Sequence, residues 1–179
     1  MNKLRTVDRV GGVAKVLCGL SLAVACSPAW SDNVKANYEM AFFSDSAQGS
    51  RILSGQYEKA IEKITNKVHG GDTLHVETNL CVAYTKAGDI AAAEAACDAA
   101  VDAAKSFRKV RRSDFAAETS AQTRARYMAI VLSNRGVLNA VKGDFDAARA
   151  DFDAALAQQA RVPSVRTNLE KLDIAEQSA

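Results

Sequence analysis

The side chains best suited to chemistry in this chain of 179 residues are four cysteines and two histidines. Cys81 and Cys97 lie in an alanine-rich stretch, each eight residues from Asp89 in a Gly-Asp turn. Two antiparallel helices that meet at this turn would place both sulfurs at the same height, because both helices rise at the same rate. This pair is therefore predicted to form a disulfide, with two buried thiols as the alternative.

The two histidines, His69 and His75, bracket the segment Gly-Gly-Asp-Thr at residues 70–73. Two imidazoles and a carboxylate can bind a metal ion, but the glycines leave their geometry loose. Asp72 or Thr73 is well suited to cap the helix that follows. A capped loop is therefore favoured over a metal site.

No nucleophile elbow, metalloprotease motif or glycine-rich phosphate loop is found in the sequence. The chain is therefore predicted not to be an enzyme and to need no cofactor. One cluster of basic residues is a candidate docking patch for an acidic or phosphate-bearing partner, and a solvated helix end is the alternative. The patch consists of Lys105, Arg108, Lys109, Arg111 and Arg112.

Residues 1–31 have the three zones of an export signal: basic residues, an uncharged apolar run at 16–26, and a small–x–small pattern that ends at Ser31. The apolar run is far shorter than the roughly 20 residues of a membrane-spanning helix. Cleavage after Ser31 and a bacterial periplasmic location are predicted. The alternative is a lipid anchor at Cys26.

The net charge of +2 originates in this leader. The leader has four basic residues and one acidic residue, which leaves 19 basic and 20 acidic residues of the 23 and 21 in the whole chain. A nearly neutral processed chain has no general attraction to nucleic acid, and no nucleic-acid partner is predicted.

Three segments of the chain align on Gly55, Gly88 and Gly143. In each, an apolar residue follows two positions on, Ala five positions on and a packing residue nine positions on. The first two glycines are 33 residues apart and the next two are 55 apart, which is one repeat plus an insertion. Asn134 and Asn168 are separated by a similar step of 34. A glycine can end one helix, and the Asp or Gln after it can cap the next.

These segments resemble the tetratricopeptide repeat (TPR) family over most of residues 41–177. The middle unit supplies Leu80, Tyr84, Gly88, Ala93 and Ala100, with Cys81 in the glycine slot and Cys97 facing it. The third unit departs from the pattern at Arg135 and Asn139 but supplies Gly136, Gly143, Ala148, Phe152 and Ala155. The first unit retains Gly55, Tyr57, Ala60 and Ile64.

The resemblance and the alanine-rich composition predict an all-α fold of stacked antiparallel helix pairs. Residues 32–179 are expected to form one TPR-like α-solenoid of about three repeats plus a C-terminal capping helix, with an insertion near 105–127. A plain antiparallel bundle is the alternative. Helices are expected near 34–53, 56–69, 73–87, 90–111, 116–142, 145–160 and 163–177.

In the family that the chain resembles, the first helix of each pair lines a concave face. That face would suit an extended peptide or a helix from another protein. Its candidate lining is Thr78, Val82, Thr85, Lys86, Ser133, Val137 and Val141. Asn79 and Asn134 occupy positions where carboxylate-clamping repeats carry asparagine, but the first unit lacks the lysines of that clamp, so no clamp is predicted.

The predicted function is therefore a non-catalytic adaptor or scaffold that binds a protein partner in the periplasm. One alternative is a structural protein that associates with itself through the ends of the stack. The other is a ligand-binding protein or an enzyme built on the helical repeats.

Overall fold

The computed structural model describes residues 4–7, 37–66, 72–107, 114–158 and 161–177. In this part of the chain the structure is mostly helical and contains two short strands, β1 (Leu4–Val7) and β2 (Met40–Phe43). The helices are α2 (Gly49–Leu53), α3 (Tyr57–Thr65), α4 (Thr73–Ala87), α5 (Ile90–Ser106), α6 (Asp114–Lys142), α7 (Phe145–Ala157) and α8 (Pro163–Glu176).

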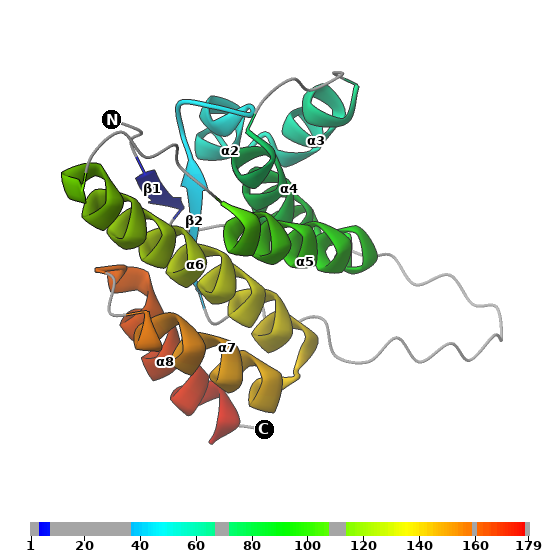
Figure 1. The fold of residues 1–179 in the computed structure, drawn as a ribbon. Coiled ribbons are helices and arrows are strands. Elements are labelled where there is room, and N and C mark those ends of the chain that lie inside the picture. Colours follow the sequence, from blue (N-terminus) through cyan, green and yellow to red (C-terminus); the bar gives the residue numbers. More distant parts are fainter. Residues whose placement is uncertain (1–3, 8–36, 67–71, 108–113, 159–160, 178–179) are drawn as a thin grey trace, which may run out of the picture.

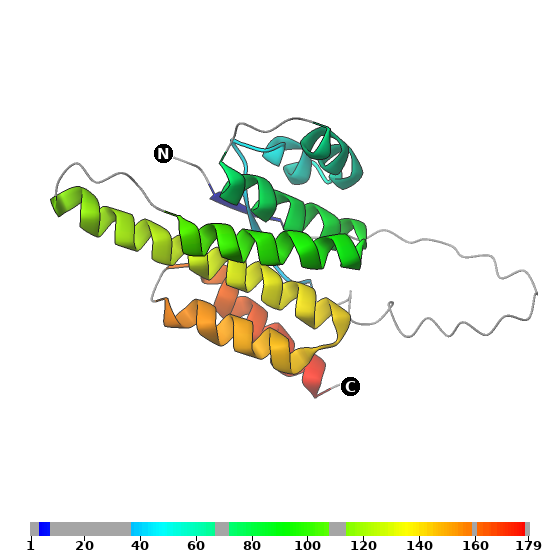
Figure 2. The same ribbon diagram turned by 45° about the vertical axis from the view of Figure 1, so that its right-hand side comes forward.

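Each helix from α3 to α8 packs against the next one along the chain. The long α6 lies between α5 and α7, and Figures 1 and 2 show these helices side by side. The predicted helical character of the chain is confirmed. In the described part of the chain, no helix is both long and apolar enough to cross a membrane.

The helix ends form where the Gly-Asp pairs predict them. Gly88 and Gly143 both have a positive φ, 85° and 82°, which a residue with a side chain rarely adopts. The next residue caps the following helix: Asp89 accepts a hydrogen bond from the Ala92 amide (3.2 Å) and Asp144 accepts one from the Ala147 amide (3.1 Å). These caps fix the turns between α4 and α5 and between α6 and α7.

A disulfide joins α4 and α5. Cys81 and Cys97 are bonded with their sulfurs 2.07 Å apart and their Cα atoms 4.7 Å apart. Both residues are buried, in the same apolar core as the small side chains Ala93 and Ala100 of α5. The predicted pairing of these two cysteines is therefore present in the structure.

The helix expected at 34–53 is wrong in its first part, because residues 40–43 form strand β2 and the helix begins only at Gly49. The run Met-Ala-Phe-Phe is apolar without a break and buried on both faces. Such a run has neither the helical nor the strand period, so periodicity alone could not distinguish the two. A Cβ on Gly49 would lie 2.0 Å from the Phe43 carbonyl oxygen, so only glycine permits α2 to begin so close to the strand.

β2 pairs with β1 in an antiparallel two-stranded sheet, in the register Leu4 to Phe43 and Val7 to Met40. Figure 1 shows β2 crossing the molecule between α4 and α6, both of which it contacts. Residues 8–31, with Cys26 and the predicted cleavage site after Ser31, lie outside the described residues. Strand β1, Leu4–Val7, lies within residues 1–31, the segment that is predicted to be a leader.

The insertion expected near 105–127 is partly helical, because α6 already begins at Asp114. Residues 108–113 lie outside the described part of the chain. From residue 114 onward, the expected insertion is therefore part of helix α6.

Candidate peptide-binding site

Three asparagines on alternate helices hold the backbone of β2 and the residue before it. Asn134, from α6, accepts a hydrogen bond from the Ala41 amide (2.9 Å) and donates one to the Ala41 carbonyl (2.8 Å). Asn79, from α4, makes the same two bonds to Phe43 (2.8 and 3.0 Å). Asn168, from α8, makes them to Glu39 (2.8 and 2.8 Å). We call these three residues the asparagine ladder.

The asparagine ladder binds one edge of an extended chain. The backbone groups of alternate residues in a strand point to the same edge, and residues 39, 41 and 43 are such a set. A side-chain amide offers one acceptor and two donors, so each asparagine can replace the backbone of a neighbouring strand. All three asparagines are at most 1% exposed. These contacts involve only the backbone of the bound segment, so they do not depend on its side chains.

Two lysines bind carbonyl oxygens at the start of the same segment. Lys86 on α4 donates a hydrogen bond to the Tyr38 carbonyl (3.2 Å). Lys171 on α8 donates one to the Asn37 carbonyl and lies 3.4 Å from the Glu39 carboxylate. The extended segment is therefore anchored through its backbone from residue 37 to residue 43.

An aromatic cluster covers the other end of β2. The ring of Phe43 stacks on His75, with 3.7 Å between centroids, and meets Tyr127 edge-on at 5.6 Å. Burial lowers the pKa of the His75 imidazole, and the nearby Asp72 carboxylate opposes this effect. His75 Nδ1 lies 3.1 Å from the Ser46 hydroxyl. Because burial favours the uncharged form of the imidazole, the His75 ring can stack on Phe43 without burying a charge.

The residues predicted to line an open concave face are mostly covered. Lys86 and Val141 are partly buried, and the other five, Thr78, Val82, Thr85, Ser133 and Val137, are buried. The hydroxyl groups of Thr78 and Thr85 bond to carbonyls of their own helix, at 2.6 and 2.7 Å. On this side, the helices α4 and α6 that carry these residues pack against β2 of the same chain.

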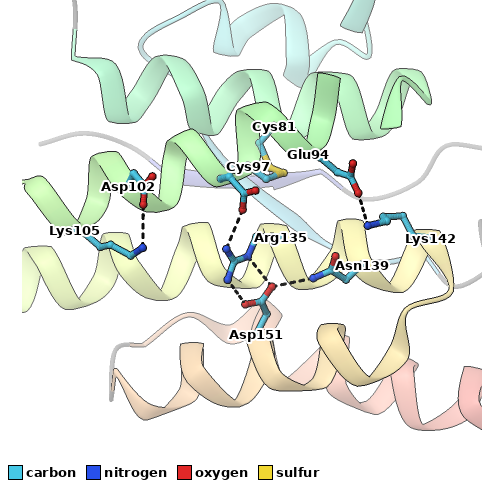
Figure 3. Close-up of polar contacts among 10 residues, drawn as sticks. Cys81, Glu94, Cys97, Asp102, Lys105, Arg135, Asn139, Lys142 and Asp151 are labelled. Carbon is cyan, nitrogen blue, oxygen red and sulfur yellow. Dashed lines mark hydrogen bonds and ion pairs between the residues drawn. A yellow bond between two sulfur atoms is a disulfide. The ribbon is translucent and has the colours of Figure 1, made fainter. Parts of the chain in front are cut away.

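A polar cluster joins α5, α6 and α7 (Figure 3). Its residues line a cleft of about 600 Å³. Arg135 forms a two-point contact with Asp151, at 2.7 and 2.9 Å, and a third bond to Asp98 at 3.0 Å. Asn139 also donates to Asp151 (3.1 Å). Within this cleft, Glu94 and Lys142 form a further ion pair. The hydrogen bonds to Asp151 and Asp98 raise the pKa of Arg135, which stays charged.

This cluster involves the two residues at which the third aligned segment differs from the TPR pattern that the sequence resembles. Arg135 and Asn139 stand where the family usually has Leu and Tyr, and both reach Asp151 on the next helix. A buried carboxylate needs charged or hydrogen-bonding partners, so the three polar residues replace an apolar contact together. The two cations and three carboxylates are joined by ion pairs across the helices, and the cluster is best understood as a contact that holds α5, α6 and α7 together.

The remaining candidates are not gathered into a site. In the basic patch, Lys105 is exposed and paired with Asp102 (2.9 Å), whereas residues 108–112 lie outside the described residues. His69 also lies outside them. Asp72 caps α4 by accepting a bond from the Leu74 amide (3.1 Å), as the capped-loop interpretation predicts.

The sequence did not predict that residues 37–43 of the same chain bind to the helices at the asparagine ladder. Asn168 was not among the residues predicted to line the concave face. A signal was present in the sequence, since the step of 34 from Asn134 to Asn168 puts them at equivalent repeat positions. What the asparagines bind could not be inferred from this spacing.

No family model matches the chain, and neither the curated proteins nor the solved structures include a match.

Proposed function

We propose that this chain is an exported, non-catalytic protein-interaction module built as a TPR-like stack of helix pairs. In this proposal the leader, residues 1–31, is removed after Ser31 and the rest of the chain works in the bacterial periplasm. The module binds polypeptide in the extended conformation on the side of the stack that carries the asparagine ladder.

The TPR-like arrangement is supported by packing and by register. Helices α3 to α8 contact one another in chain order, which is typical of stacked helix pairs. The ladder asparagines come from α4, α6 and α8, the first helices of successive pairs in the proposed register. A plain bundle has no reason to place equivalent residues on alternate helices.

The observation that carries the proposal is the asparagine ladder. It satisfies both backbone groups of three alternate residues, and the lysines at positions 86 and 171 bind two further carbonyls. This is the chemistry of a surface that binds a peptide through its main chain. In this protein the first occupant is its own segment, so a partner must be bound together with β2.

Crosslinking in the native periplasm tests this function. A tagged chain is crosslinked in the cells that export it and then purified, and we expect one partner protein to be recovered with it. Asn134→Leu should abolish the recovery, because it removes two of the backbone contacts that position β2. Lys63→Ala, at an exposed position on α3, should leave recovery unchanged. Circular dichroism should first establish that both variants are folded.

Two results would contradict the proposal. In the first, no protein is crosslinked to the wild-type chain. In the second, the folded Asn134→Leu variant recovers the same protein equally well. Recovery of further copies of this chain alone would favour the self-associating structural protein instead.

A further inference from the structure

Strand β2 has two edges, and they are bound in different ways. The ladder occupies the edge formed by residues 39, 41 and 43. The backbone groups of Met40 and Phe42 point to the opposite edge, which we call the outer edge. In the structure, β1 is paired with this outer edge.

We infer that the outer edge of β2 is a strand-addition site, where the processed chain binds an extended segment of a partner protein in antiparallel orientation. This inference rests on the proposed function, because it requires that residues 1–31 are removed. Strand β1, Leu4–Val7, lies within those residues, so the processed chain lacks it.

The register in the structure defines the contacts that the partner must supply. Met40 is opposite Val7 and Phe42 is opposite Arg5. Since Ala41 and Phe43 already bond to the ladder, the hydrogen bonds between the strands can come only from Met40 and Phe42. Without β1, two amides and two carbonyls on this edge have no strand partner. Such an unpaired edge is a template for another chain.

The ladder makes this edge a rigid template. With β1 in place, residues 40–43 are at most 2% exposed. The ladder bonds to Ala41 and Phe43 do not involve β1, so the ladder can hold the strand in the extended conformation before a partner arrives. A partner strand therefore binds without the cost of ordering β2, which favours affinity. Most β-strands at an edge are anchored by a neighbouring strand, whereas this one is anchored by helices on its inner side.

The occupant that fits is a single linear segment of a partner chain. In the described residues the sheet has only two strands, so one four-residue segment is enough to complete it. Met40 and Phe42 would bind the partner mainly through its backbone. The apolar surroundings of β2 favour uncharged partner residues with a high propensity for β-strands. A tail or linker meets these requirements.

A labelled peptide tests the site directly. The protein is purified from the exporting cells, its N-terminus is determined by mass spectrometry, and a fluorescent peptide of residues 1–10 is titrated into it. We expect an N-terminus at Asp32 and saturable binding in fluorescence anisotropy. N-methylation of the peptide at Arg5 and Val7 should weaken binding by about tenfold or more, because it removes both amides that face β2.

The matched control is the peptide N-methylated at Leu4 and Thr6, whose amides face away from β2 and whose affinity should be close to that of the unmodified peptide. Four outcomes would overturn the inference. They are an exported protein that retains residues 1–31, no binding of the unmodified peptide, equal loss with both methylated peptides, and a dimer in light scattering that the peptide dissociates. The last result would identify a second copy as the occupant. If crosslinking recovers a partner but the peptide does not bind, the interaction function stands and the site is elsewhere.

Discussion

Replacing Asn134 by leucine should remove the central contact between the helices and β2. The Asn134 side chain bonds to both backbone groups of Ala41, and it is 1% exposed. Leucine has a similar size but offers neither a donor nor an acceptor. The Ala41 amide and carbonyl would then be buried without their side-chain partner, since Ala41 is only 2% exposed.

The loss in unfolding free energy follows from the two backbone groups that lose their partner. Each buried backbone group that loses its partner costs about 1–3 kcal/mol, so two groups cost roughly 2–6 kcal/mol of unfolding free energy. The similar volume of leucine adds little to this figure, since no large cavity forms. A loss of this size is a large fraction of the stability of a domain of this length.

Urea unfolding followed by far-UV circular dichroism measures the loss, and the neighbouring residue supplies the control. The Ser133 hydroxyl is buried and has no hydrogen-bond partner among the residues that the structure describes. Ser133→Ala therefore removes no bond, and its change in unfolding free energy should be below about 1 kcal/mol. If Asn134→Leu is no more destabilising than Ser133→Ala, the ladder does not hold β2 and the reasoning is refuted.

Three further predictions concern other contacts. Replacing Cys81 and Cys97 together by alanine should lower the unfolding free energy by about 3 kcal/mol, given their separation of 16 residues; a change below 1 kcal/mol, by the same urea assay, would contradict this. The pKa of His75 is lowered in the folded state, so the unfolded state takes up the proton first as the pH falls. Stability should therefore be complete above about pH 6.5 and decline as the pH falls from there to the lowered pKa, and a His75→Gln variant should lose this dependence. Asp151→Ala should cost about 2–3 kcal/mol by leaving Arg135 partly buried without its main partner, and adding Arg135→Leu should recover much of the loss in a double-mutant cycle.

The helices were predictable because their ends are encoded locally. Gly88 with Asp89, and Gly143 with Asp144, bond only to residues a few positions away, so the sequence shows where the helix must stop and restart. The disulfide was predictable for a related reason, because a turn of known position sets the register of its two flanking helices.

The extended segment could not be predicted in the same way. Its contacts with the asparagine ladder join residues 36, 93 and 129 positions apart, so no local pattern near residue 41 indicates them. Tertiary packing also decides its conformation, because an apolar run of four residues can be buried equally well as a helix or a strand. The polar cluster on Arg135 was likewise visible only as a departure from the repeat, since its partner Asp151 lies on another helix.

Amide hydrogen exchange by NMR across residues 39–43 of the exported protein tests whether the ladder holds β2 and leaves its outer edge open. We expect an alternating pattern, in which the amides of Glu39, Ala41 and Phe43 are protected by the ladder and those of Met40 and Phe42 exchange faster. Adding the peptide of residues 1–10 should protect the latter two as well. Fast exchange at all five amides would contradict the ladder, and uniform protection without the peptide would contradict the open outer edge.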